Sequence, residues 1–268
     1  MKKNEINICF CTDKKLIDFL PTVINSIIRK NQDNEIKVHI ISTDDADFSD
    51  TIKYINSIPN FEATMYHKQW DLSYKGLPHV SKATMVRLYI PELLECDKVI
   101  YLDIDVIVNL NLYELYNVDC GETGIALKNS INQTWEKFFD PNSGKKSGNC
   151  GIIVMNFETL RKNNFTQKCL KIHAKNQDRH DQYVINMYAD GNHTVLEPRF
   201  NIFHRQDDHL VDEKSDYIFH YAGTKKPYFH NTGKYQYLWD ENRKRISKAQ
   251  YKKLWSKLKR MNFGVPWK

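Results

Sequence analysis

The chain has 268 residues, 41% hydrophobic and 27% charged, so it is long enough to bury a core and has the composition of a soluble globular domain. No apolar run reaches the roughly 18 residues that a membrane-spanning helix needs. The first ten residues lack the apolar stretch of a signal peptide, so we expect a cytoplasmic protein. Its six cysteines include no CxxC pair and no zinc-type spacing with histidine, which predicts reduced, buried thiols.

The net charge of +6 is concentrated at one end of the chain. Residues 241–268 hold ten Lys or Arg and one acid, whereas the rest has 29 basic and 32 acidic residues, a net charge of −3. A nucleic-acid-binding domain is expected to carry its basic residues on a face of the folded body. The distribution therefore predicts no nucleic-acid partner. It also predicts a catalytic or binding domain over residues 1–240, followed by a basic tail over 241–268.

The first part of the chain alternates strand and helix patterns. Expected strands cover residues 6–11, 36–42 and 61–66, and expected helices cover 14–30, with a kink at Pro21, and 48–58. This β-α-β-α-β order predicts a mostly parallel sheet with helices on both faces.

The rest of the chain continues the pattern less regularly. We expect helices at 81–94, capped by Ser81, and at 157–162, 165–176 and 181–190; strands at 98–108, 151–156 and 217–221; and a polar loop at 140–148. Residues 191–240 otherwise show weak periodicity. In the tail, residues 247–262 have the spacing of a basic amphipathic helix that begins with the capping box Ser247-x-x-Gln250.

The clearest chemical signal is Asp103-Ile-Asp105, within the apolar segment 98–108. In an extended segment, residues two apart point to the same side, so both carboxylates could converge on one divalent cation. Unpaired carboxylates beside so apolar a strand would cost several kcal/mol, so a metal ion or an ion pair must compensate them. A second Asp-x-Asp, at Asp45 and Asp47, lies in a polar stretch that has no such requirement. Ligands of open α/β sheets bind at the carboxyl ends of strands, where Thr12-Asp13 is also expected.

Several segments in order resemble glycosyltransferase family 8, which includes bacterial lipopolysaccharide galactosyl- and glucosyltransferases. The resemblance covers residues 6–228 and is carried by FCTD at 10–13, HVSKATMVRLYIPELL at 79–94, CDKVIYLDIDVIV at 96–108, NCGIIVMN at 149–156, DQYVIN at 181–186, RFN at 199–201 and HYAGTKKPY at 220–228.

The resemblance implies a GT-A fold, which is a Rossmann-like, mostly parallel central sheet with flanking helices, and a metal-centred donor site. It implies that Asp103, Asp105 and His220 bind Mn2+, or Mg2+ in its place. The donor-binding residues it implies are Cys11, Thr12, Asp13, Arg87, Asp103, Ile104, Asp105, Asn149, His220, Gly223 and Lys226, and the implied catalytic residues are Asp181 and Gln182.

Each of these roles has a structural alternative. His220 could be a core histidine, Lys226 could be a solvated lysine, Asp181 could cap a helix and Arg87 could lie on a helix face. The family commonly has Asn and Tyr two and three residues after the aspartate at position 13, where this chain has Lys15 and Leu16. We expect Lys15 to point to solvent.

The resemblance implies a retaining glycosyltransferase that moves galactose or glucose from a UDP-sugar to a glycan, lipid-linked or protein-linked acceptor. Front-face attack is favoured over double displacement, because Gln182 is a poor nucleophile. The competing hypotheses are a UDP-sugar-binding module without turnover and, from the basic tail, a nucleic-acid-associated protein. The tail helix could hold the enzyme peripherally on an anionic inner membrane surface, or it could pack on the catalytic domain.

Overall fold

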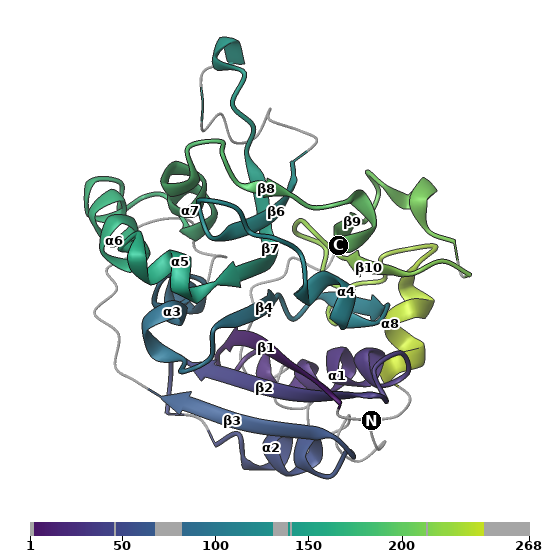
Figure 1. The fold of residues 1–268 in the computed structure, drawn as a ribbon. Helices are drawn as coiled ribbons and strands as arrows, with labels where there is room; N and C mark the ends of the chain where they lie inside the picture. The colour runs from purple at the N-terminus through teal and green to yellow at the C-terminus, as the bar shows by residue number, and fades with distance from the viewer. Residues whose placement is uncertain are drawn as a thin grey trace.

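The computed structural model describes residues 3–45, 47–67, 82–130, 139, 141–212 and 214–243. Its centre is a seven-stranded sheet with the order β3-β2-β1-β4-β7-β6-β8 (Figure 1). The first half is parallel and is built from β1 (Asn4–Thr12), α1 (Leu20–Ile28), β2 (Asn34–Ser42), α2 (Ser49–Asn56) and β3 (Phe61–His67). The predicted β-α-β-α-β order is confirmed.

The expected kink at Pro21 is wrong. A 3-10 turn covers Ile17–Phe19, and Pro21 lies in the first turn of α1. A proline there removes an N–H that would have no partner within the helix, so it begins the helix instead of bending it.

The segment 98–108 is not one central strand. It forms β4 (Lys98–Leu102) and β5 (Val106–Asn109), and Asp103–Asp105 make a turn between them. β4 pairs with β1 in the large sheet, whereas β5 belongs to a second sheet with the order β5-β10-β9. A continuous β-branched run cannot reveal this break, because both strands are buried.

The other half of the large sheet contains β6 (Ile125–Asn129), β7 (Gly148–Asn156) and β8 (Thr194–Val195). β7 runs antiparallel to both β4 and β6, so the sheet is mixed, although most of its pairings are parallel. The second sheet adds β9 (Ile202–Phe203) and β10 (Tyr217–His220), which lie in the region where the sequence had allowed only the strand at 217–221.

Three helices fall close to the predicted ranges: α5 (Phe157–Lys162), α6 (Phe165–Lys175) and α7 (Asp181–Ala189). Two others, α4 (Leu112–Tyr116) and α8 (Gln236–Arg243), were not predicted. The helix expected at 81–94 is instead an eight-residue 3-10 segment, Lys82–Tyr89, followed by the single turn α3 (Ile90–Leu93) with Pro91 in its first turn. The proposed cap, Ser81, lies outside the described residues, as do residues 68–80.

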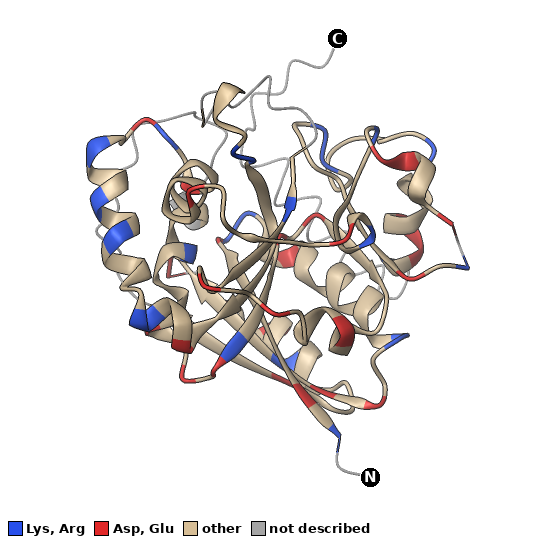
Figure 2. Cartoon of the chain, turned by 45° about the horizontal axis from the view of Figure 1, so that its top comes forward, with Lys and Arg blue, Asp and Glu red and all other residues tan. Residues whose placement is uncertain are grey.

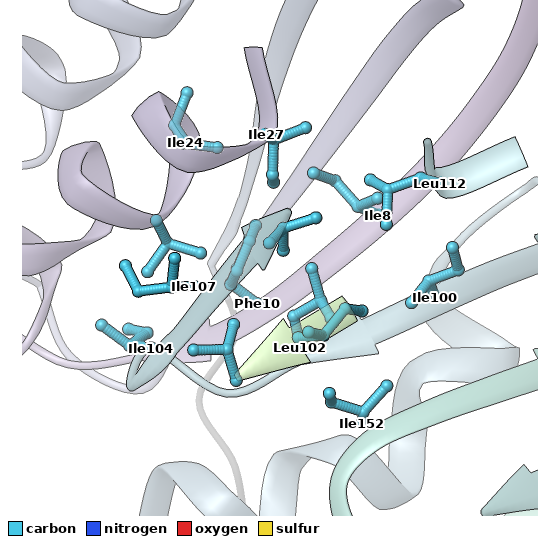
Figure 3. Packing of buried hydrophobic residues seen from close by; sticks show 14 of the residues in the cluster. Ile8, Phe10, Ile24, Ile27, Ile100, Leu102, Ile104, Ile107, Leu112 and Ile152 are labelled. Atoms are coloured by element: carbon cyan, nitrogen blue, oxygen red, sulfur yellow. The ribbon is translucent and has the colours of Figure 1, made fainter. Parts of the chain in front are cut away.

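The core has two parts because side chains alternate along β1. Ile6, Ile8 and Phe10 join the cluster beneath α1, the second sheet and α8, whereas Cys9 and Cys11 face the cluster beneath α3, α5, α6 and α7. Figure 3 shows part of the first cluster, in which Phe10 and Leu102 of adjacent strands lie near Ile104 and Ile107. All six cysteines are free, as predicted, and Cys96 alone is not buried.

No described helix is long and apolar enough to cross a membrane. Helix α8 continues across residue 240, where the tail was expected to begin, and the predicted helix 247–262 lies outside the described residues. Basic and acidic residues are mixed over most of the described chain, except that blue bands dominate α5 and α6 (Figure 2). Lys168, Lys171 and Lys175 of α6 are exposed, and α6 contains no acid, so the body has a short basic face that the sequence did not reveal.

Candidate metal and donor site

Asp103, Asp105 and His220 lie together where the two sheets meet. One oxygen or nitrogen of each falls within 4.8 Å of the others, and among the described residues no other group of His, Cys, Asp or Glu meets that condition. His220 Nε2 is 3.5 Å from an oxygen of Asp105 and 4.0 Å from one of Asp103. The aspartates converge because the chain turns between β4 and β5, so strand alternation was the wrong reason for a correct grouping.

Backbone hydrogen bonds fix this turn from both sides. The N–H of Asp103 donates to the carbonyl of Gly151 on β7 at 2.8 Å, and the carbonyl of Asp105 accepts from the N–H of Tyr221 just after β10 at 3.0 Å. The turn that carries both carboxylates is therefore hydrogen-bonded to both sheets, which supplies the rigidity that a metal site requires.

The geometry around these side chains fits a divalent cation. Two carboxylates and one imidazole suit Mn2+, whereas Ca2+ favours oxygen ligands alone. His220 Nδ1 is 2.9 Å from Asn201 Oδ1, so Nε2 is the nitrogen that faces the aspartates. A Cβ on Gly151 would lie 2.2 Å from His220 Cε1 and 3.0 Å from Asp103 Oδ2, so only glycine leaves room for this arrangement. His220 is thus buried, and its Nε2 faces two carboxylates.

Arg87 holds one side of the site. Its Nη2 donates to Asp103 at 3.1 Å, its Nε is 3.0 Å from a carboxylate oxygen of Asp181, and its Nη1 donates to the carbonyl of Cys150 at 2.6 Å. Burial works against the charged guanidinium, but Asp181, Tyr101 and Asp103 keep the pKa of Arg87 above its usual value. Arg87 lies in the 3-10 segment Lys82–Tyr89, but it does more than occupy a helix face, because it is only 4% exposed and pairs with two aspartates.

Lys226 provides a second positive charge, which pairs with Asp105 whereas Arg87 pairs with Asp103. Its ammonium forms an ion pair with Asp105 and donates to the carbonyl of Tyr221 at 3.3 Å. Burial would raise the pKa of Asp105, but Lys226 and His220 hold it well below its usual range. Desolvation raises the pKa of Asp103, although Arg87 opposes this change. The alternative of a solvated Lys226 is wrong for this state of the protein, because its head group is bound.

The expected nucleotide side lies at the end of β1, beside the metal residues. Cys9 of β1 pairs with Tyr101 of the parallel strand β4, so Cys11 and Asp103, each two residues further on, lie beside each other. Cys11 and Thr12 are buried, and Asp13 is 9% exposed. Asp13 accepts hydrogen bonds from the backbone N–H groups of residues 15 and 16 at 2.8 and 3.2 Å, so it also shapes the turn after β1. Lys15 is exposed, as expected.

The expected sugar side joins β7 to the start of α7. Gln182 Oε1 accepts from the N–H of Cys150 at 3.0 Å and from Nδ2 of Asn149 at 3.3 Å. Asp181 is buried and paired with Arg87. The alternative of Asp181 as a helix cap is wrong, because His180 is the N-cap of α7 and accepts from the N–H of Gln182 at 3.2 Å.

Two further expected residues differ in what they can offer a ligand. Gly223 has φ of +98° with open space where a Cβ would be, so a backbone approach by a ligand is possible there. The side chain of Ile104 is 5% exposed and packs in the core (Figure 3), so this residue can reach a donor only through its backbone. Asp45, of the second Asp-x-Asp, is highly exposed and pairs with His67.

Sequence reasoning missed three side chains that complete the site. The Tyr101 hydroxyl donates to Asp103 at 2.7 Å, and its ring lies 4.3 Å from the Arg87 guanidinium carbon. Tyr228 stacks on Phe19, and burial, together with nearby Asp105, Asp103 and Asp13, raises its pKa. Asn201 contacts His220. Tyr101, two residues before Asp103 on β4, could have been found from strand alternation, whereas the other two lie in the weakly patterned region.

The comparisons with known proteins agree with this geometry. The family model described as glycosyl transferase family 8 matches residues 7–232. Glycosyltransferase GlyF of Streptococcus pneumoniae is 27% identical over 238 residues, which are 83% of this chain and 57% of GlyF. The lipopolysaccharide 1,2-glucosyltransferase of Escherichia coli is 23% identical over 83% of this chain and 72% of that protein. The chain thus spans little more than half the length of GlyF.

Among solved structures, the galactosyltransferase LgtC in complex with donor and acceptor sugar analogues superposes with a TM-score of 0.76. The alignment covers 92% of this chain and all of that chain, with 19% sequence identity. The fold is therefore GT-A, as predicted.

Proposed function

The chain belongs to glycosyl transferase family 8, and we propose that it is a retaining enzyme that transfers a hexose, galactose or glucose, from a UDP-sugar to an acceptor in an Mn2+-dependent reaction. The observation that carries the proposal is the convergence of Asp103, Asp105 and His220 between two sheets, where Arg87 pairs with Asp103 and Lys226 with Asp105. Mg2+ is the alternative ion.

Asp103, Asp105 and His220 would hold the ion, which when bound supplies positive charge to the diphosphate of the donor and of the UDP product. Lys226 binds Asp105 in this structure and would bind the diphosphate as a point charge once an ion neutralises that carboxylate. Gly223 offers a close backbone approach on the same side. The nucleotide would be bound by Cys11, Thr12, Asp13 and the backbone of Ile104.

The sugar would lie against Arg87, Asn149, Asp181 and Gln182, and the contacts of the last two support front-face retention. A double displacement needs a nucleophile that can reach the anomeric carbon. The Asp181 carboxylate is about 5% exposed and is tied to Arg87, and Gln182 Oε1 already accepts two hydrogen bonds. We therefore assign both residues to positioning and electrostatics during attack by the acceptor.

The choice of galactose or glucose follows from the relatives, because LgtC is named a galactosyltransferase and the E. coli relative a glucosyltransferase. The acceptor would be a glycan, a lipid-linked oligosaccharide or a glycoprotein in cell-surface glycan synthesis. The catalytic domain, predicted over residues 1–240, would extend to the end of α8 at Arg243, and the basic tail, predicted over 241–268, would follow it. We propose that the protein works in the cytoplasm, with the tail on the anionic inner face of the membrane, and that it has no nucleic-acid partner.

The test is release of UDP from UDP-galactose and UDP-glucose by the purified full chain, first alone and then with acceptors. Chelator should silence the enzyme, and Mn2+ should restore activity better than Ca2+. Asp103→Asn or Asp105→Asn should lower the rate by at least two orders of magnitude, about 2.7 kcal/mol of transition-state stabilisation. Full activity in chelator would refute the metal assignment. Donor binding without UDP release, with every acceptor tried, would instead identify a binding module.

A further inference from the structure

A chain of buried amide side chains lies behind the metal ligand His220. Asn201, which is fully buried, places its Oδ1 2.9 Å from His220 Nδ1 and donates from its Nδ2 to Asn149 Oδ1 at 3.1 Å. Asn149 in turn donates from its Nδ2 to Gln182 Oε1 at 3.3 Å. The amide chain therefore connects the residues expected to face the sugar with the imidazole expected to bind the ion.

Two backbone N–H groups determine the direction of these hydrogen bonds. The two ends of an amide side chain look alike, so its orientation must be derived from partners whose role is fixed. Gly151 N–H can only donate, and it donates to Asn149 Oδ1 at 3.0 Å. Cys150 N–H donates to Gln182 Oε1 at 3.0 Å, so Asn149 must direct its Nδ2 toward that oxygen. Both constraints give Asn149 the same orientation.

The orientation of Asn149 then decides which ring nitrogen of His220 carries the hydrogen in the neutral imidazole. Because Asn149 offers an oxygen, Asn201 must offer it Nδ2 and direct Oδ1 toward the imidazole. An oxygen at that position requires a hydrogen on Nδ1. In a neutral ring the lone pair is then on Nε2, which is the nitrogen that faces Asp103 and Asp105.

A buried ion pair holds Asn201 in place through its backbone. Lys128 of β6 donates to the Asn201 carbonyl at 2.8 Å and forms an ion pair with Asp207, and both side chains are about 5% exposed. Asp207 also accepts from the N–H of Phe203 at 3.0 Å, and the Lys128 ammonium lies 3.9 Å from the centre of the Phe203 ring. The pair thus ties the large sheet to the segment that carries Asn201.

We propose that Asn149 and Asn201 form a directional hydrogen-bond relay that holds His220 in the tautomer with hydrogen on Nδ1 and presents Nε2 to the metal ion. Both are positioning residues for the ligand, and the Lys128–Asp207 pair fixes the backbone of the relay. The metal step rests on the proposed function, whereas the tautomer is a property of the metal-free protein. Partners of metal-bound histidines typically change metal affinity by about 10- to 100-fold when they are removed.

The experiment first reads the tautomer in the full-length, metal-free protein by long-range proton–nitrogen NMR, from spectra in which one ring nitrogen carries hydrogen and the other does not. The His220 signal is assigned by its loss in His220→Gln. The wild type should show hydrogen on Nδ1, and Asn201→Ala should show a mixture of tautomers. Asn201→Asp keeps an acceptor for Nδ1 and should restore the wild-type pattern. Asn149→Ala frees the Asn201 amide to turn over and should also give a mixture.

The second readout is Mn2+ affinity by calorimetry. Asn201→Ala should weaken Mn2+ binding by about 10- to 100-fold, and Asn201→Asp should recover most of it. The matched control is Asn31→Ala, since Asn31 is also fully buried and hydrogen-bonded but lies between α1 and Leu110. It should lower stability without changing the tautomer or the affinity.

Hydrogen on Nε2 in the wild type, or an unchanged tautomer in Asn201→Ala and Asn149→Ala, would overturn the relay. If Asn201→Ala does not fold, the wild-type and Asn149→Ala spectra decide. A wild type with the expected tautomer that binds no Mn2+ would contradict the proposed function while leaving the relay's control of the tautomer intact.

Discussion

Replacing Gly151 by alanine should disable the metal site while the sheet still forms. The new Cβ would lie 2.2 Å from His220 Cε1, 2.9 Å from Nε2 and 3.0 Å from Asp103 Oδ2, well inside the 3.4–4 Å of ordinary contact. The imidazole has little room to retreat, because Asn201 binds its other nitrogen and the Phe203 ring packs edge-on with centroids 6.1 Å apart. Overpacking of this kind costs about 1–3 kcal/mol, which a domain can survive.

The functional loss should be larger than the loss of stability suggests. If His220 and Asp103 are displaced, Mn2+ affinity should fall by at least about tenfold. UDP release should fall by about 100-fold, or roughly 2.7 kcal/mol. The assays are Mn2+ calorimetry and UDP release, with urea unfolding to measure stability.

Gly148→Ala is the matched control on the same strand. Its Cβ would lie 2.5 Å from Leu127 Cβ, so it overpacks β7 against β6 without contact with His220 or Asp103. It should lose comparable stability and keep its metal affinity. Equal Mn2+ affinity in Gly151→Ala and Gly148→Ala would refute the reasoning.

Three further outcomes follow from the contacts of the charged residues. UDP should raise the melting temperature strongly only with Mn2+ present, and His220→Ala should weaken that coupling more than Lys226→Ala does; an equal UDP shift with and without metal would contradict this. Arg87→Lys should lower the free energy of unfolding in urea by about 3 kcal/mol, because one ammonium cannot reach Asp103, Asp181 and the Cys150 carbonyl together. A loss below about 1 kcal/mol would show that these three contacts of Arg87 do not stabilise the fold. Since the pKa of Asp105 is lowered in the fold, its ionised form stabilises the metal-free protein above the unfolded pKa of about 4, and this contribution is lost as the pH falls. Asp105→Asn should therefore be less stable than wild type at pH 7, and the difference in free energy of unfolding should narrow toward pH 3. A difference that stays constant with pH would show that the shift is absent.

Local sequence patterns predicted the order of elements because each strand or helix carries its own apolar pattern. These patterns are a continuous apolar run for β1, which is buried on both faces, alternation for β2, and helical spacing for α1 and α2. They could not reveal that 98–108 divides between two sheets, because β4 and β5 are both buried and equally apolar. The break is a tertiary effect, set by the pairing of β5 with β10, more than a hundred residues away.

The candidate site was predictable where its residues fall in recognisable segments. Asp103, Asp105 and His220 were found in this way, and the structure brings them together. Asn201 and Tyr228 also lie in recognised segments, RFN and HYAGTKKPY, but they were not given roles, because only the fold shows that Asn201 contacts His220 and that Tyr228 lies near the two aspartates. The pairing of Lys226 with Asp105 was also missed, because ion pairs between residues 121 positions apart depend on the fold.

The last prediction concerns the basic tail, for which α8 defines a safe truncation point. Trp239 is fully buried, and the Asn242 carbonyl accepts from Asn25 of α1 at 2.9 Å, so a shortened protein must keep α8. A chain that ends at Arg245 does so and removes the amphipathic pattern of residues 247–262.

Each Lys or Arg near an anionic surface adds about 1 kcal/mol of attraction. The full chain should therefore sediment with anionic but not neutral liposomes, and salt should release it. The shortened protein should stay in solution and still release UDP. Since the exposed lysines of α6 offer a second basic face, Lys168→Gln with Lys171→Gln in the full chain is the matched control and should leave binding unchanged. If the shortened protein binds liposomes as well as the full chain does, or if it unfolds, the tail is not a membrane anchor.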